Sequence, residues 1–94
     1  MPYTIVRQRV KDFPRWRRAF DERAELRKEH GSKGGHLFRD PEEKEEIVVF
    51  LAWEDLDRAR SYLSSEAAAE EREAGGVEGD AEVLYLEELG RPSG

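Results

Sequence analysis

Hydrophobic and polar residues alternate near the start of the chain, and this alternation predicts a β-strand over residues 3–10. Thr4, Val6 and Val10 fall on one side of the expected strand, whereas Tyr3 and Ile5 fall on the other. This pattern is typical of a strand because successive side chains point to opposite faces.

The spacing then changes to a helical one over about residues 14–30. Asp12 occupies the expected N-cap, and Pro14 suits the first turn, where a missing N–H costs nothing. Apolar side chains recur on one face of this helix at Phe13, Trp16, Phe20 and Ala24. Gly31 is expected to end the helix, and residues 33–35 are expected to form a loop.

Two strands joined by a polar turn are predicted next. The first is short and spans residues 36–39, and the turn around Pro41 occupies residues 40–44. The second spans residues 46–54 and contains β-branched and aromatic residues at consecutive positions. A strand that is apolar on both sides is typical of one that is buried on two faces.

The remaining sequence predicts one more helix and one more strand. Asp55 is expected to cap a helix that runs to Ala74, with a break at Ser64–Ser65, and glycines follow its end. A final strand is expected over residues 81–88. Residues 91–94 are expected to form a frayed tail after a single domain of residues 1–90.

This order of elements, βαββαβ, predicts an α+β ferredoxin-like plait. Its four-stranded antiparallel sheet would carry both helices on one face. The central strand over residues 46–54 is nevertheless apolar on both sides, so the other face of the sheet needs a cover. We therefore expect a homodimer that packs sheet against sheet.

Charge is distributed unevenly along the 94 residues, whose formal net charge is −6. Residues 1–40 hold 11 Lys and Arg against 6 Asp and Glu, a balance of +5, and residues 41–94 hold 5 against 16, a balance of −11. We expect the basic and acidic halves to pair within the fold. A pI near 5.0 and an acidic, aliphatic third strand argue against nucleic acid.

Several other classes of protein are excluded by what the sequence lacks. No apolar run approaches the ~20 residues of a membrane span, and the N-terminus does not have the pattern of a signal peptide. These features predict a soluble cytoplasmic domain without a membrane partner. The chain has no cysteine, and His30 and His36 are too few for a convincing metal site. Phosphate-binding loops and a nucleophile elbow are absent as well.

The face of the first predicted helix changes from aromatic to cationic along its length, through Trp16, Phe20, Arg23, Arg27 and His30. Two guanidinium groups at the rim of an apolar cavity could bind a carboxylate, an enolate or a phenolate. Alternatively, these cations overhang the sheet, where the C-terminus of the helix favours positive charge.

Three further polar residues could face the same mouth. His36 and Arg39 lie on the strand that follows this helix, and Gln8 lies on the first strand and could add a neutral donor.

Segments spread over nearly the whole chain resemble one protein family. These segments are Val10–Trp16 with Phe20, Phe38–Asp40, Val48–Phe50, Trp53–Leu56, Ala59–Arg60 and Ala74–Val77. In their order and spacing they are similar to small dimeric α/β-barrel proteins related to the antibiotic biosynthesis monooxygenases, some of them called cyclase-like. The resemblance implies a ferredoxin-like subunit, a dimer with back-to-back sheets, and a pocket between sheet and helices in each subunit. Better-understood relatives oxidise aromatic polyketides or quinols with molecular oxygen and without flavin or metal, whereas others degrade haem.

Matched position by position, Arg27 corresponds to an arginine of the family pattern, and Gln8 and Arg23 stand where histidines are frequent. The Asn-Trp-His set of the haem-degrading branch has no clear match here. The resemblance thus implies a cofactor-independent monooxygenase that acts on an aromatic or polyketide-like anion, with no metal or cofactor. A non-catalytic small-molecule-binding or stress-related dimer is the alternative.

If the protein is an enzyme, each predicted site residue has a role. Arg27 and Arg23 would hold the anion, Gln8 would donate a hydrogen bond, and His36 would accept a proton. The apolar wall would be formed by Trp16, Phe20, Trp53 and Tyr85.

Overall fold

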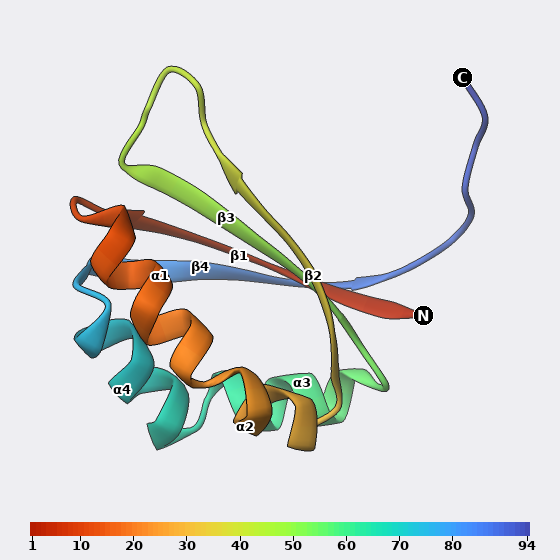
Figure 1. The fold of residues 1–94 in the computed structure, drawn as a ribbon. Helices are drawn as coiled ribbons and strands as arrows, with labels where there is room; N and C mark the ends of the chain where they lie inside the picture. The colour runs from red at the N-terminus through yellow and green to blue at the C-terminus, as the bar shows by residue number, and fades with distance from the viewer.

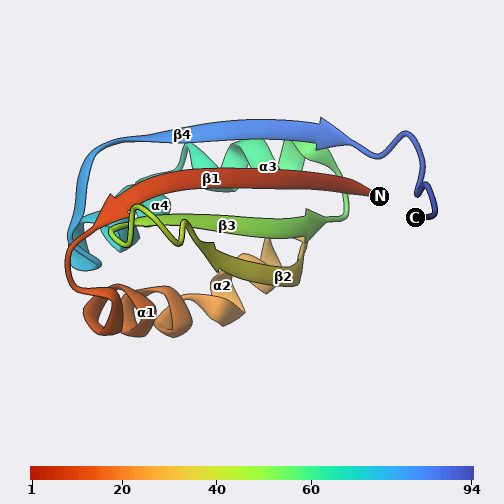
Figure 2. The ribbon, with the colours of Figure 1, turned by 90° about the horizontal axis from the view of Figure 1, so that it is seen from above.

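The computed structural model describes residues 1–94, which form one sheet with helices on one of its faces (Figure 1). The elements in chain order are β1 (Pro2–Val10), α1 (Phe13–Glu22), α2 (Ala24–Glu29), β2 (Ser32–Arg39), β3 (Glu46–Trp53), α3 (Leu56–Leu63), α4 (Glu66–Ala74) and β4 (Val77–Glu87). The four strands are antiparallel and lie in the order β2-β3-β1-β4, as Figure 2 shows from above. The predicted ferredoxin-like α+β fold is confirmed.

The register between β1 and β3 decides which side chains meet the helices. Val6 lies opposite Val49 and Thr4 lies opposite Leu51, and all four side chains are buried against the helical layer. At the end of this row the buried indole of Trp53 donates a hydrogen bond of 2.8 Å from Nε1 to Thr4 Oγ1. This bond satisfies two polar groups that would otherwise be costly to bury.

The first predicted helix consists of two segments. Asp12 caps α1 as expected, since its Oδ1 accepts a hydrogen bond of 3.1 Å from the Arg15 N–H. At Arg23 the backbone leaves helical geometry (φ −103°, ψ 11°), and α2 begins in a new direction. Consequently, the prediction that Ala24 continues the apolar stripe is wrong, because Ala24 is exposed and Arg27 is buried instead.

The second predicted helix is divided at Ser64–Ser65, as the sequence suggested. The Ser64 hydroxyl donates to the Arg60 carbonyl over 2.7 Å, and the Ser65 Oγ accepts from the Ala68 N–H over 3.2 Å. Serine hydroxyls compete with the helical backbone for hydrogen bonds, so the first serine ends α3 and the second caps α4.

Two strands begin earlier than the sequence indicated. β2 begins at Ser32, so residues 33–35 belong to a strand and do not form the predicted loop. Gly35 is needed there because an added Cβ would lie 1.8 Å from the Phe50 carbonyl oxygen of β3. β4 begins at Val77, and its pairing with β1 is irregular opposite residues 7–9.

The sheet face that points away from the helices is apolar at its centre and has no cover within the chain. Register places Ile5, Phe50 and Leu84 together on it, and the Phe50 ring stacks on Tyr3 with 5.0 Å between the centroids. Phe38 is 55% exposed and Leu84 is 46% exposed. The central strand β3 was expected to be buried on both faces. In the single chain it is buried on the face toward the helices and only partly buried on the other.

Ion pairs join the basic N-terminal half to the acidic C-terminal half, as the charge pattern predicted. On the open sheet face Arg7 Nε lies 2.6 Å from Glu46 Oε1, and on the helical side Arg27 pairs with Glu71. Lys33 Nζ lies 3.1 Å from Glu54 Oε1 at the end of the sheet. None of the helices combines the length and apolar character that crossing a membrane would require.

Candidate functional site

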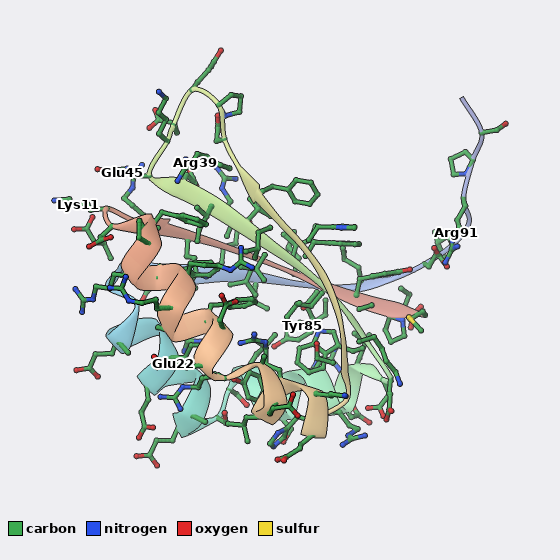
Figure 3. The ribbon with its side chains drawn as sticks, in the orientation of Figure 1. Lys11, Glu22, Arg39, Glu45, Tyr85 and Arg91 are labelled. Carbon is green, nitrogen blue, oxygen red and sulfur yellow. The ribbon has the colours of Figure 1, made fainter.

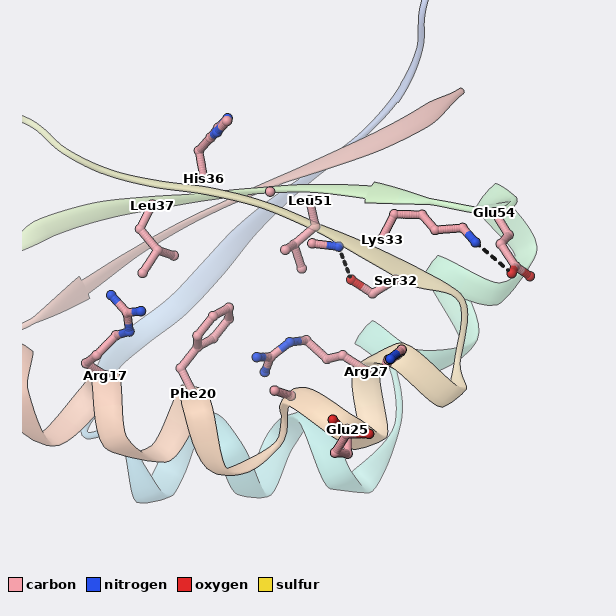
Figure 4. A pocket seen from close by; sticks show the side chains of 14 residues that line it. Arg17, Phe20, Glu25, Arg27, Ser32, Lys33, His36, Leu37, Leu51 and Glu54 are labelled. Atoms are coloured by element: carbon pink, nitrogen blue, oxygen red, sulfur yellow. Dashed lines mark hydrogen bonds and ion pairs between the residues drawn. The ribbon is translucent and has the colours of Figure 1, made fainter.

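A cavity of about 650 Å³ lies between the β2 edge of the sheet and helices α1 and α2. Leu37 and Leu51 point into it from the sheet, and Phe20 points into it from α1 (Figure 4). Its polar lining includes Arg17, Lys28, Lys33, Glu25 and Glu54. A cavity of this size can hold a ligand of two or three aromatic rings.

Arg27 enters this cavity from α2 and is itself only 5% exposed. Its guanidinium carbon lies 3.6 Å from the centroid of the Phe20 ring, within range for a cation–π contact. Its Nη1 donates a hydrogen bond of 2.7 Å to Glu71 Oε1 on α4. The side chain is thus held by an aromatic face and by a carboxylate, which fixes its position at the boundary of the cavity.

A second cavity of about 30 Å³ shares Phe20, Arg27 and Leu51 with the first and reaches the middle of the sheet. It is lined by Gln8 from β1, Tyr62 from α3 and Glu71 from α4, among others. The Oε1 atom of Gln8 and the hydroxyl of Tyr62 are buried there without hydrogen-bond partners. The volume suffices for a water molecule or for one oxygen substituent of a ligand.

Burial shifts the pKa values of the two acidic groups in this inner cavity. It raises the pKa of the Glu71 carboxyl, although the Arg27 guanidinium pulls that pKa in the opposite direction. Burial also raises the pKa of the Tyr62 phenol, so this hydroxyl stays neutral and able to donate at neutral pH. At the mouth, Lys33 and then Arg58 lower the pKa of Glu54, which keeps that carboxylate charged.

Taken together, these groups can bind an aromatic ligand that carries a polar oxygen. Apolar side chains would contact the rings, and Arg27 would stabilise negative charge that forms on the oxygen. Gln8 Oε1 can accept a hydrogen bond, and the Tyr62 hydroxyl can donate or accept one. No group of three His, Cys, Asp or Glu side chains converges as a metal site would require.

Of the residues predicted from the sequence, three come together at this site, namely Arg27, Phe20 and Gln8. Arg23 lies at the junction of α1 and α2 and does not line either cavity, and its Nη2 is 4.0 Å from Glu70 Oε2. Of the two arginines expected to hold the anion, Arg27 lines the cavities and Arg23 does not.

His36 is among the residues of β2 that border the larger cavity, but its side chain does not face the mouth as expected. Its side chain points away from the cavity in Figure 4, and its ring stacks on Phe50 of the open sheet face. Successive strand residues alternate between faces, and Leu37 takes the inward position. Arg39 does point to the helical side, but its guanidinium lies over Phe13, 5.0 Å from the ring centroid.

The other predicted wall residues support the site from a distance. Trp16 is buried and stacks on Phe20, with centroids 4.9 Å apart, and Trp53 is buried beside Tyr62. Tyr85 lies on the helical side of β4 (Figure 3), and the Arg60 guanidinium is 4.9 Å from its ring centroid. None of the three lines either cavity described above.

Tyr62 and Glu71 are among the residues of the inner cavity that sequence reasoning missed. Both stand three residues after a buried alanine, Ala59 and Ala68 respectively, so a helical spacing of three would have found them. Glu71 was hidden because it lies in a helix rich in exposed glutamates, where a charged residue is usually read as solvated.

Replacing Tyr62 with phenylalanine is expected to leave the free energy of unfolding unchanged or to raise it by up to about 1 kcal/mol, because a buried hydroxyl without a partner is removed. Affinity for a naphthol is expected to fall about tenfold. Urea unfolding and calorimetric titration measure the two effects. The matched control is Thr4→Val, which leaves the Trp53 N–H unpaired and should cost about 1–3 kcal/mol. A similar loss of stability in Tyr62→Phe would show that the Tyr62 hydroxyl has a hydrogen-bond partner in the folded protein.

Comparisons with known proteins give matches to monooxygenases and related oxygenases. A family model described as antibiotic biosynthesis monooxygenase matches residues 11–74. No curated protein matches the chain.

Several solved structures share the fold. The chain is similar to a Bordetella bronchiseptica protein provisionally named an antibiotic biosynthesis monooxygenase, with a TM-score of 0.78, 16% identity and coverage of 94% of this chain and 96% of that one. A further match is a mutant of SnoaB, a cofactor-independent oxygenase from Streptomyces nogalater, with a TM-score of 0.73, 17% identity and coverage of 96% and 94%.

Proposed function

The chain belongs to the antibiotic biosynthesis monooxygenase family, and we propose that it is a cofactor-independent monooxygenase of an aromatic or polyketide-like compound. In such a reaction the anion of the substrate reacts with oxygen directly. One oxygen atom enters the substrate, and the other leaves as water with two hydrogens and two electrons that the substrate gives up, so that a CH2 group of an anthrone becomes a carbonyl. The protein needs only to bind the substrate, stabilise its anion and orient it.

The observation that carries this proposal is the position of Arg27 beside Phe20 at the boundary of the cavity. Its guanidinium is almost fully buried, lies on the Phe20 ring and borders both cavities. A cation in such a dry environment stabilises a developing oxyanion more strongly than one in water does. The description of SnoaB as a cofactor-independent oxygenase adds support from a protein of similar fold.

The proposal includes a homodimer formed through the open face of the sheet. Ile5, Phe38, Phe50 and Leu84 would be covered by the same residues of a second copy. The cavity lies on the opposite side of the sheet, between the strands and the helices, so each subunit would keep a site of its own.

Oxygen uptake tests the catalytic part of the proposal. Purified protein is expected to consume oxygen with at least one member of a panel of anthrones and quinols. Leu37→Trp, which fills the cavity, should reduce the rate by about tenfold or more through lost binding. Glu42→Trp adds the same side chain to the exposed turn before β3 and is the matched control.

The alternative function, ligand binding without catalysis, uses the same cavity. This alternative would be favoured if a compound of the panel bound to wild type more tightly than to Leu37→Trp and no oxygen were consumed. Equal oxygen uptake by wild type and Leu37→Trp would instead show that the reaction does not take place in this cavity.

A further inference from the structure

Arg27 already has a counter-ion. Its Nη1 lies 2.7 Å from Glu71 Oε1, and the exposed fractions of the two side chains are only 7% and 14%. An anionic ligand that approached Arg27 would meet the negative charge of Glu71 at nearly the same distance. Because charges interact strongly in a poorly solvated site, Glu71 would offset much of the attraction to Arg27 itself. Of the other cations near Glu71, Arg72 lines the inner cavity and Arg23 lines neither cavity.

A neutral ligand with an acidic proton does not meet this obstacle. On the basis of the function proposed above, we propose that Glu71 is the proton acceptor of the site and that the ligand enters as a neutral weak acid, a phenol or an enol. The O–H bond of the ligand breaks, and its proton forms an O–H bond with the Glu71 carboxylate. The electron pair of the broken bond stays on the ligand oxygen, which replaces Glu71 as the counter-ion of Arg27. The net charge of the cavity stays the same.

The surroundings of Glu71 support this role. It is the carboxylate that lines the inner cavity, next to the unpartnered Tyr62 hydroxyl and Gln8 Oε1. Burial raises the pKa of Glu71 and so brings its basicity closer to that of a phenolate. The exposed carboxylates Glu25 and Glu54 line only the outer cavity, and His36 points away from it.

The proposal predicts where the proton goes, and this can be counted. The probe is 4-nitrophenol, whose phenolate absorbs visible light, added at about pH 6, where the free compound is largely neutral and an ordinary carboxyl is ionised. Wild type is expected to generate the phenolate band while releasing close to no protons to the solution, since Glu71 retains the proton. In Glu71→Gln each phenolate formed is expected to release about one proton. A pH indicator in weak buffer measures the release.

A second ligand reports the reverse effect. For 2-naphthoate, which is already an anion, Glu71→Gln should bind about tenfold or more tightly than wild type, because the repelling carboxylate is gone. Glu73→Gln makes the same change at an exposed position of α4 and should behave as wild type does in both assays. Glu71→Asp retains a carboxylate and should again release close to no protons.

Wild-type release of one proton per phenolate would overturn the role of Glu71, and so would tighter binding of 2-naphthoate by wild type than by Glu71→Gln. Absence of 4-nitrophenol binding would overturn it too. If Glu71→Gln does not fold, the numbers of protons released by wild type and by Glu71→Asp still decide whether this carboxylate accepts the proton. Neither readout involves oxygen. If wild type retains the proton but consumes no oxygen, the oxygenase function is rejected and the role of Glu71 as proton acceptor stands. If Glu71→Gln consumes oxygen as fast as wild type does, the role of Glu71 is rejected and the oxygenase function stands.

Discussion

Replacing Arg27 with methionine is expected to lower the free energy of unfolding by about 3–5 kcal/mol near neutral pH, the range for breaking a buried ion pair on one side. The substitution keeps much of the apolar volume against Phe20 but leaves Glu71 buried without its partner. It should also abolish oxygen uptake, because the buried cation that is shared by the two cavities is removed. Urea unfolding and an oxygen electrode measure the two losses.

The loss of stability should depend on pH in a defined direction. In wild type, burial raises the pKa of Glu71 and Arg27 partly offsets this effect. Without Arg27 the pKa of Glu71 in the folded state rises further, so the folded variant binds more protons than its unfolded chain above the ordinary carboxyl pKa. Stability of the variant therefore falls as pH rises through this window. Relative to wild type, the deficit should be small near pH 4 and largest near pH 7.

Removing both charges separates ion-pair energetics from packing. The double variant Arg27→Met/Glu71→Leu is expected to recover at least half of the stability lost by Arg27→Met, because apolar pairs often replace buried ion pairs without loss. It should remain inactive. A deficit for Arg27→Met that is below about 1 kcal/mol, or that does not change with pH, would contradict the buried pairing with Glu71.

Replacing Phe50 with glutamate is expected to convert the protein from dimer to monomer, with dimer affinity reduced about 1,000-fold or more. Phe50 lies in the middle of the open sheet face, between Ile5 of β1 and His36 of β2. In a symmetric dimer the substitution buries two unpaired carboxylates, each at a cost of several kcal/mol. Sedimentation at micromolar concentration should give 10.9 kDa for the variant and twice that mass for wild type.

The matched control for this variant is Ala69→Glu, which adds a carboxylate at an exposed position of α4 on the helical side. It should sediment as wild type does. A wild-type mass of one chain would refute the proposed dimer, and a dimeric Phe50→Glu would show that the subunits associate through another surface.

Much of the fold could be predicted because local signals agreed with tertiary structure. Asp12 and Asp55 cap helices as expected, and the order of strands and helices is correct. Glycine caused the main error, since the same residue permits a turn and a close approach of two strands. Gly35 serves the second purpose, and β2 accordingly begins at Ser32.

The site was harder to predict because it depends on directions that sequence spacing does not fix. Arg27 was expected at the cavity and lies there, although the predicted helix is interrupted at Arg23. Its partner Glu71 is 44 residues away along the chain, and the pairing follows from the packing of α4 beside α1. His36 was misplaced because, in a strand, a shift of one residue reverses the face.

A crystal structure of the protein with bound 2-naphthol would show whether an aromatic ligand binds between the sheet and α1–α2 with its oxygen at Arg27. The rings are expected against Phe20, Leu37 and Leu51, with the naphthol oxygen within hydrogen-bond distance of the Arg27 guanidinium and the Glu71 carboxyl. An empty cavity at saturating ligand, with the Arg27–Glu71 pair unchanged, or ligand bound only to the open sheet face, would contradict it.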